Sequence, residues 1–136
     1  MREIKLKCIH KDTKEINEVS AIDWHGNWIS YGEIEKKENG HIDLVWRKLN
    51  LHHLIEFTGF KDKNGVEIYQ GDIIDLCQSK YEGEHNLNVI IFENGCFCAK
   101  DELTTRNLHE TISIGIDYEV IGNIYKNPEL LEKCNN

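Results

Sequence analysis

The sequence predicts a mainly β protein, in which an N-terminal β-meander precedes a small barrel-like unit and a short C-terminal helix. Short apolar segments with period-two alternation recur along the chain, beginning with Ile4, Leu6 and Cys8, and this pattern is typical of half-buried strands. Turn signals built on asparagine and glycine separate these segments, most clearly at Asn39-Gly40 and Asn64-Gly65. Such pairs favour β-hairpins, so the chain is expected to consist of short strands joined by tight turns.

The first third of the chain is predicted to form the meander. The alternation over residues 4–8 indicates a half-buried edge strand, with Lys5 and Lys7 on its opposite face. Residues 19–24 and 28–31 indicate two further strands, joined by a turn at His25-Gly26-Asn27 because glycine and asparagine tolerate a positive φ. Asn39-Gly40 then turns the chain into a returning strand at residues 41–46.

Residues 48–57 fit two structures. Leu49, Leu51 and Ile55 match period two, but Leu51 and Ile55 also lie on one helical face. Periodicity therefore does not decide between strand and helix. We expect a short helical turn or loop that leads into a strand at residues 55–60.

The second half of the chain predicts a series of hairpins. Residues 62–65 close a hairpin onto residues 66–69, and Gly71-Asp72 forms a sharp corner before a strand at 73–77. Residues 78–87 are polar and are expected to form a mobile loop. In the next hairpin, residues 89–92 pair with residues 96–99, and the strand at 118–125 comes last.

The C-terminus contains a clear helix start. Asn127 can cap free backbone N–H groups, Pro128 suits the first helical position, and Glu129 complements the positive end of the helix dipole. These residues predict a short helix from 128 to 133 that packs Leu130 and Leu131 on the barrel.

The composition favours a small cytoplasmic protein with reduced thiols. At 136 residues the chain is long enough for one domain with a buried core. Its formal charge of −8 is spread along the sequence without an acidic or basic block, which disfavours nucleic-acid phosphates. Five cysteines at scattered spacings do not suit a disulfide framework. The sequence has no apolar run of the roughly 20 residues that a membrane helix needs and no secretory signal, so no membrane partner is expected.

The cysteine and histidine pairs do not predict a metal site. Cys96 and Cys98 would project from the same face of a strand, but zinc needs about four ligands in paired motifs. Buried, small apolar side chains are the better interpretation of this pair. His52 and His53 are neighbours and point in different directions in either a strand or a helix, so we expect solvated or partly packed histidines.

The segment from Asp62 resembles a calcium loop only superficially. Such a loop needs glycine at its sixth position and glutamate at its twelfth. Placing Gly65 sixth puts Phe60 at the first ligand position and Gly71 at the twelfth, so a turn is expected instead. The sequence also has no nucleophile elbow, phosphate-binding glycine loop or H-E-x-x-H motif. The protein is therefore predicted not to be an enzyme and to bind no cofactor or metal.

Four aromatic side chains gather in the meander, namely Trp24, Trp28, Tyr31 and Trp46. Proteins that bind single-stranded nucleic acid combine such residues with a positively charged groove. Here there is little basic interleaving beyond Lys36, Lys37 and Arg47. We expect these aromatic residues to belong to the core or to a subunit interface.

Three segments together resemble the YopX-like family of small proteins encoded by bacteriophages and prophages. The central segment EFTGFKDKNGVEIYQGDIIDL, residues 56–76, is the most specific part, with Gln70 where the family more often has glutamate. Residues 118–131 are also a close match. Residues 1–16 resemble the opening strand of the family, with Lys7-Cys8-Ile9 where the family usually has R-A-W or R-V-W.

The resemblance implies a set of signature residues that the fold needs, and it implies no established activity. The signature residues are expected to be structural, and they are Thr58, Gly59, Asp62, Asn64, Gly65, Ile68, Tyr69, Gly71, Asp72, Gly122, Asn127 and Pro128. By analogy, a G-D-I-I strand followed by a hairpin and a final strand is similar to an SH3-like barrel. We therefore expect a meander or arm at residues 1–54 and an SH3-like barrel with a C-terminal helical turn at 55–136, both within one YopX-like unit.

Three functional hypotheses follow. The favoured one is a phage or prophage accessory protein that acts as a non-enzymatic small-barrel interaction module for an unidentified host or phage protein. The second is a nucleic-acid-binding protein that uses the barrel face or the lysine-bearing N-terminal strand. The third is an acidic inhibitor that occupies the nucleic-acid groove of a host protein. Unpaired strand edges and three tryptophans also favour a homo-oligomer.

Overall fold

The computed structural model describes residues 4–32, 35–36, 38–76, 85–113 and 117–132. Strands dominate these residues, so the mainly β fold class is confirmed. The chain divides into two compact units, which are treated separately below. Unit 1 comprises Phe57–Asn136 together with Met1–Glu3, and unit 2 comprises Ile4–Glu56.

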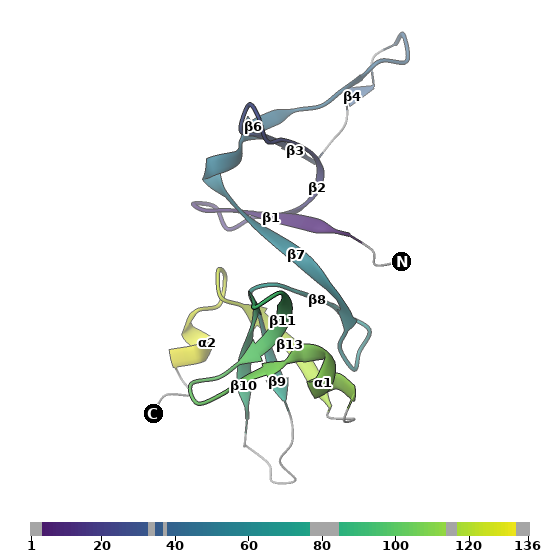
Figure 1. The fold of residues 1–136 in the computed structure, drawn as a ribbon. Helices are drawn as coiled ribbons and strands as arrows, with labels where there is room; N and C mark the ends of the chain where they lie inside the picture. Colours follow the sequence, from purple (N-terminus) through teal and green to yellow (C-terminus); the bar gives the residue numbers. More distant parts are fainter. Residues whose placement is uncertain (1–3, 33–34, 37, 77–84, 114–116, 133–136) are drawn as a thin grey trace. The chain divides into compact units, whose positions relative to one another are not determined.

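Unit 2 is the antiparallel meander (Figure 1). Its strands are β1 (Leu6–His10), β2 (Ile16–Asp23), β3 (Trp28–Tyr31), β4 (Glu35–Lys36), β5 (Ile42–Asp43) and β6 (Trp46–Lys48). A 3₁₀ turn at Leu49–Leu51 then leads into β7 (His52–Lys61). The predicted helical turn before a strand is therefore confirmed, with the strand beginning three residues earlier than expected. The turns expected at Asn27 and Gly40 are also present, and both residues have a positive φ.

One prediction for the meander is wrong. Strand β1 is not an edge strand, because it pairs with β2 on one side and with β7 on the other. The order of strands in unit 2 is β6-β3-β2-β1-β7, which makes β6 the edge. Alternation along β1 shows which side chains share a face, but it contains no information about a partner strand more than 40 residues away.

Unit 2 has a core cluster of its own. Cys8, Ile29 and Tyr31 form a buried cluster, against which Val19 and Leu54 pack. Cross-strand pairing explains the cluster, since Cys8 faces Leu54 and Val19 faces Tyr31 in the register. The register of β2 and β3 shifts between Val19 and Ala21, and such bulges bend a strand.

Unit 1 is built from short strands and two helical turns. Its elements after β7 are β8 (Glu67–Tyr69), β9 (Asp72–Leu76), β10 (Leu87–Glu93), β11 (Cys96–Lys100), β12 (Thr105–Asn107), α1 (Leu108–Ser113), β13 (Tyr118–Asn123) and α2 (Glu129–Glu132). Five of these strands form an antiparallel sheet in the order β12-β11-β10-β9-β13. Strand β8 pairs instead with the second half of β7, whose first half pairs with β1.

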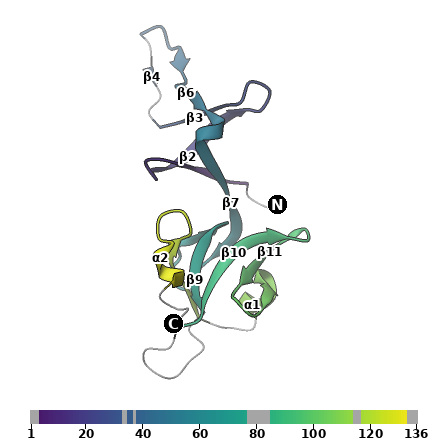
Figure 2. The same cartoon turned by 90° about the vertical axis from the view of Figure 1, so that its left-hand side faces the viewer.

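The core of unit 1 joins β8, α1 and the five-stranded sheet. Ile68 and Leu108 are fully buried and belong to one cluster with Ile74, Ile90 and Phe97. Because the sheet packs its side chains against those of β8 and α1, unit 1 is a small barrel-like sandwich. Among the described residues, the paired strands do not form a closed ring. Figures 1 and 2 place α1 and α2 at opposite sides of the unit 1 sheet.

The predicted hairpins of unit 1 are present, and so is the short C-terminal helix. The sequence reasoning missed β12 and α1. Asn107 marks the start of α1, because its side-chain oxygen accepts a hydrogen bond from the Glu110 N–H at 3.3 Å. An asparagine followed three residues later by glutamate resembles a helix start and was the available signal. The loop predicted at 78–87 lies outside the described residues except for its last three positions.

Candidate functional site

Asp62 organises the corner between β7, β8 and β13. Its Oδ1 accepts hydrogen bonds from the N–H groups of Asn64 at 2.8 Å and Val66 at 2.9 Å, and its Oδ2 accepts one from Val120 at 3.0 Å. Burial alone would raise the pKa of Asp62, but the three N–H groups outweigh burial and hold that pKa below its ordinary value. Both carboxylate oxygens are therefore engaged in joining the β7–β8 turn to β13.

Gly71 and Asp72 form a second corner. The Asp72 Oδ2 accepts a hydrogen bond from the Tyr69 N–H at 2.7 Å. Gly71 has a φ of 88°, and a Cβ placed on it would lie 2.8 Å from the ring of Tyr125. Its N–H donates to the Ile90 carbonyl at 2.7 Å, and its carbonyl accepts from the Ile124 N–H at 2.9 Å. Glycine is required here because the backbone has a positive φ and because the Tyr125 ring leaves no room for a Cβ.

The C-terminal signature residues hold β13 to α2. The Asn127 Oδ1 accepts a hydrogen bond from the Asn123 N–H at 3.2 Å, and a Cβ on Gly122 would lie 2.6 Å from this same oxygen. The Asn127 carbonyl accepts from the Leu130 N–H, and the Pro128 carbonyl accepts from the Leu131 N–H. These contacts begin the helical turn that the sequence predicted.

The remaining signature residues lie in the β7–β8 hairpin of unit 1. The Thr58 hydroxyl donates to the Ile68 carbonyl at 2.8 Å, and the Asn64 side chain donates to Glu119 at 3.4 Å. Gly59 and Gly65 both have positive φ values. Every signature residue named above thus participates in turns, hydrogen bonds or core packing within unit 1.

A buried polar cluster in unit 2 surrounds His52. The His52 Nδ1 lies 2.8 Å from the Lys48 carbonyl and therefore donates, which leaves Nε2 to accept from the Tyr31 hydroxyl at 2.7 Å. Burial is the main cause that lowers the pKa of His52. The Arg47 guanidinium stacks over the Tyr31 ring at 4.2 Å and donates to the Tyr31 carbonyl at 2.9 Å. His52 is thus buried and hydrogen-bonded, where the sequence reasoning expected a solvated or partly packed side chain.

The buried thiols of Cys8 and Cys98 are poor nucleophiles. Burial raises the pKa of Cys8 to about 11, so this thiol stays protonated. Cys96 and Cys98 project from the same face of β11 as predicted, with their sulfurs 3.7 Å apart. Burial, followed by the hydrogen bond with Cys96, raises the pKa of Cys98. Within the described part of the chain, His, Cys, Asp and Glu form no group of three or more that could hold a metal ion.

The three tryptophans of unit 2 are exposed and do not belong to its core, so of the two predicted locations the core is wrong for them and the subunit interface stays a prediction. Trp24 is 65% exposed, Trp28 is 41% exposed and Trp46 is 42% exposed, whereas Tyr31 is buried. In the β3–β6 register Trp28 faces Lys48, and Ser30 faces Trp46. Trp28 and Trp46 are therefore diagonal neighbours on one face of the sheet. We call the face formed by Asp23, Trp28, Trp46 and Lys48 the tryptophan surface.

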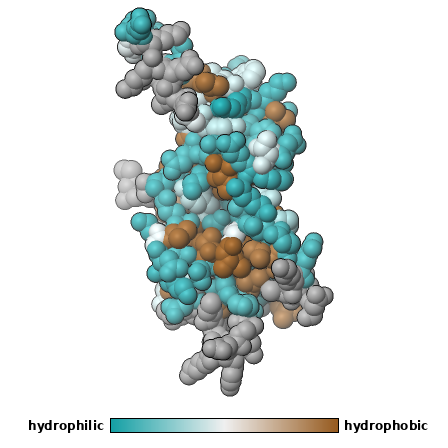
Figure 3. All heavy atoms as spheres, turned by 180° about the vertical axis from the view of Figure 1, so that it is seen from behind, coloured by the Kyte–Doolittle hydropathy of each residue, from teal (hydrophilic) through white to brown (hydrophobic). Residues whose placement is uncertain are grey.

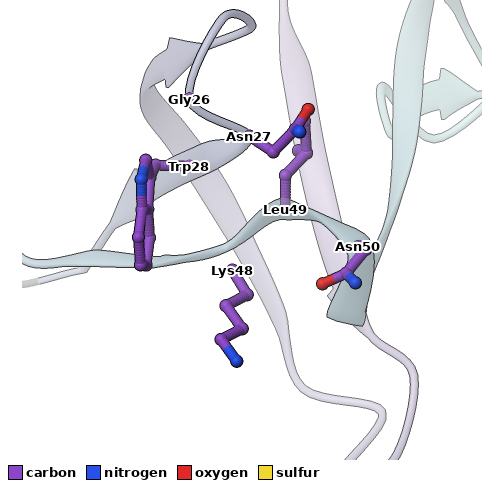
Figure 4. Close-up of a pocket in the computed structure, with 6 residues that line it drawn as sticks. All are labelled: Gly26, Asn27, Trp28, Lys48, Leu49 and Asn50. Carbon is purple, nitrogen blue, oxygen red and sulfur yellow. The ribbon is translucent and has the colours of Figure 1, made fainter.

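A pocket of about 430 Å³ lies beside Trp28, and its described lining residues are Gly26, Asn27, Trp28, Lys48, Leu49 and Asn50 (Figure 4). The indole of Trp28 and the side chain of Lys48 extend in the same direction from neighbouring strands. Gly26 permits the close approach, because a Cβ there would lie 2.8 Å from the Trp28 ring. The pocket combines an aromatic wall, two amides and one ammonium group.

Unit 1 presents a different kind of surface. Apolar side chains gather in a band on one of its faces (Figure 3). The large apolar residues exposed in unit 1 include Val66, Phe92, Leu103 and Ile121. Apolar exposure therefore occurs in both units, but exposed tryptophans occur only in unit 2. None of the helices in the described ranges is both long and apolar enough to pass through a membrane.

Solved structures that resemble nearly the whole chain include the following two. Protein EF1440 from Enterococcus faecalis is 27% identical with a TM-score of 0.71, and the match covers 96% of this chain and 99% of that one. Protein yopX from Bacillus subtilis is 18% identical with a TM-score of 0.59, over 93% of this chain and 97% of that one, which shows a shared fold. No curated protein matches the chain. The family model described as YopX protein matches residues 6–132, and the chain therefore belongs to the YopX family.

Proposed function

We propose that this YopX-family protein is a non-enzymatic interaction module that binds a partner protein through the tryptophan surface. The exposure of Trp28 and Trp46 on one face of a rigid sheet carries this proposal. Tryptophan is among the residues that contribute most to protein–protein interfaces, because it buries a large area at a small entropic cost. In keeping with its family, we propose that it acts as a phage or prophage accessory protein in the bacterial cytoplasm.

The polar clusters of both units support a non-enzymatic role. Asp62 is occupied by three backbone N–H groups, and both ring nitrogens of His52 are engaged. A general base or nucleophile needs a free lone pair directed into a cleft where substrate can bind. These side chains instead use their lone pairs to hold the fold.

Nucleic-acid binding has weaker support. The tryptophan surface offers one ammonium group, from Lys48, and one carboxylate, from Asp23. Single-strand binders place aromatic platforms in a positively charged groove, and the net charge of −8 opposes phosphate at longer range. Addition of single-stranded DNA at low salt is expected to leave tryptophan fluorescence unchanged.

Affinity capture tests the proposed function. The tagged protein is incubated with a nuclease-treated bacterial lysate, beside a Trp28→Ala/Trp46→Ala double variant and a Leu103→Ala control. Leu103 is 92% exposed in unit 1, so its truncation removes an exposed apolar side chain from a different surface. We expect wild type and control to recover the same partner, and the double variant to recover about 10-fold less.

Two results would overturn the proposed function. The first is that a folded double variant, verified by its circular dichroism, recovers the partner as well as wild type does. The second is that no partner exceeds the background of an untagged control.

A further inference from the structure

Trp28 lies between a carboxylate and an ammonium group. In the register, Asp23 of β2 faces Trp28 of β3, and Trp28 in turn faces Lys48 of β6. The side chains of directly paired residues project from the same face of a sheet. The tryptophan surface therefore has an acidic side and a basic side, separated by one indole ring.

The acidic side is a pocket of about 510 Å³, and its described lining residues are Asp23, Trp28 and Trp46. The Asp23 Oδ1 accepts a hydrogen bond from the Gly26 N–H at 2.9 Å, which orients the carboxylate. Among the described residues, the other oxygen, Oδ2, has no hydrogen-bond partner. Two tryptophans and an aspartate with one oxygen outside this hydrogen bond thus line one cavity.

We propose that the pocket formed by Asp23, Trp28 and Trp46 binds an arginine side chain of a basic partner protein. This inference rests on the proposed function and names the chemistry that the tryptophan surface recognises. Indole rings attract cations through their negative faces, and a carboxylate forms charge-assisted hydrogen bonds with a guanidinium group. The pocket supplies both kinds of contact to the same cation.

Arginine fits this pocket better than lysine. Its planar guanidinium can stack on an aromatic ring while its edge donates to a carboxylate, and it loses less hydration than an ammonium group does. The same pairing already occurs inside unit 2, where the Arg47 guanidinium stacks over the Tyr31 ring. The net charge of −8 also attracts a basic partner, as complementary charge steers association.

The basic side of the tryptophan surface is compatible with an arginine bound on the acidic side. The pocket beside Lys48 has Asn27 and Asn50 in its lining, and its described lining residues include no carboxylate. This pocket suits an acidic side chain or a backbone carbonyl next to the arginine. The full surface therefore fits a partner segment in which arginine is adjacent to a hydrogen-bond acceptor.

Nuclear magnetic resonance of the indole N–H groups gives a direct test, because the chain has only three tryptophans. The probe is a short peptide of alternating glycine and arginine. A lysine–glycine peptide and a citrulline–glycine peptide serve as matched probes, since citrulline keeps the shape of arginine without its charge. We expect the arginine peptide to shift the signals of Trp28 and Trp46 but not that of Trp24, and the citrulline peptide to bind at least about 10-fold more weakly.

Three variants separate recognition from folding. Asp23→Asn keeps the oxygen that accepts from Gly26 but removes the charge, and should weaken peptide binding about 3- to 10-fold. Trp46→Ala should weaken it by a similar factor. Trp24→Ala is the control, because Trp24 is not among the described lining residues of either pocket, and it should bind as wild type does.

Several outcomes would overturn the inference. Equal binding of the arginine and citrulline peptides would show that the positive charge of the ligand does not contribute to binding. Unchanged peptide binding by Asp23→Asn would show the same. Shifts of Trp28 and Trp46 with oligothymidylate but not with the arginine peptide would indicate nucleic acid. Shifts that appear on concentrating the protein alone would indicate a second copy of the chain. If these tests fail while the capture experiment still depends on Trp28 and Trp46, the proposed function survives and only the arginine assignment is lost.

Discussion

The two units differ in where their charge lies and in how they use their aromatic residues. Unit 1 contains 15 acidic and 8 basic residues, whereas unit 2 contains 9 acidic and 8 basic residues. Unit 1 thus carries −7 of the formal charge of −8, and unit 2 carries −1. Charge that looked evenly spread along the sequence is concentrated in one unit. All three tryptophans, by contrast, lie in unit 2 and are exposed.

This difference separates the part of the chain that holds the signature residues from the part that carries the tryptophan surface. The signature residues lie in unit 1, where their polar groups join backbone segments to one another. The tryptophan surface lies in unit 2, outside the three segments that resemble the family in sequence. Substitutions should therefore affect mainly stability in unit 1 and mainly binding in unit 2.

The largest expected effect is that of Asp62→Ala. Removing a buried carboxylate that accepts three backbone hydrogen bonds should lower the free energy of unfolding by about 3–4 kcal/mol, measured by urea unfolding with circular dichroism. Asp101→Ala is the matched control, because Asp101 also accepts from two backbone N–H groups, but beside exposed residues. The control should lose about 1 kcal/mol. Equal losses would show that the Asp62 corner contributes nothing beyond an ordinary turn.

Gly71→Ala should have the next largest effect. The substitution places a Cβ 2.8 Å from the Tyr125 ring, at a residue whose φ is 88°. Backbone strain and the steric clash together should lower the free energy of unfolding by about 2–3 kcal/mol. Gly95→Ala shares the positive φ but has no atom within 4 Å of the added Cβ. Thermal unfolding should show a loss of only about 1 kcal/mol for this control. If both variants lose the same amount, the ring contact is unimportant.

Acid should weaken unit 2 through His52. Burial, as the main cause, lowers the pKa of His52 from 6.5, so the unfolded chain takes up a proton at a higher pH than the folded chain does. Stability is therefore present above about pH 6.5 and is lost as the pH falls from there toward the lower pKa of the folded state. Tryptophan fluorescence reports on unit 2 and should give a lower urea midpoint at about pH 5.5 than at about pH 7.5.

His52→Gln tests the origin of this pH dependence, because glutamine cannot take up a proton. The change in midpoint between the two pH values should become smaller in this variant. It should not disappear, because burial also lowers the pKa of His53. A pH dependence as large as that of wild type would assign the effect to other groups.

The smallest expected effect is that of Trp24→Ala. A side chain that is 65% exposed loses little buried area on truncation, so the free energy of unfolding should change by about 0.5 kcal/mol or less. Differential scanning calorimetry can measure this change. A loss above about 2 kcal/mol would place Trp24 in the core and weaken the contrast between the two units.

The sequence was sufficient to predict the hairpins and the C-terminal helical turn of unit 1. Hairpins followed from pairs such as Asn64-Gly65, and the C-terminal turn followed from Asn127 and Pro128. These predictions succeeded because a positive φ or a helix cap depends on a few neighbouring residues. The helix α1 was missed because it is short and its start signal at Asn107 is weak.

Only part of the candidate site could be predicted from the sequence. The gathering of Trp24, Trp28 and Trp46 in the meander was evident, but the sequence left open whether these side chains lie in the core or at a subunit interface. Exposure depends on which face of β3 and β6 is covered, and the sequence of either strand does not state this. The same limit explains why His52 was expected to be solvated or partly packed and is in fact buried.

The sequence by itself determined the family, the mainly β class and the tight turns, because each depends on residue identity over short distances. Only the tertiary structure decided that β1 lies inside the sheet and that Asp23, Trp28 and Lys48 form one row. Such pairings join strands distant in sequence, and their register follows from the burial of whole faces. The acidic and basic sides of Trp28 therefore exist only in the folded chain.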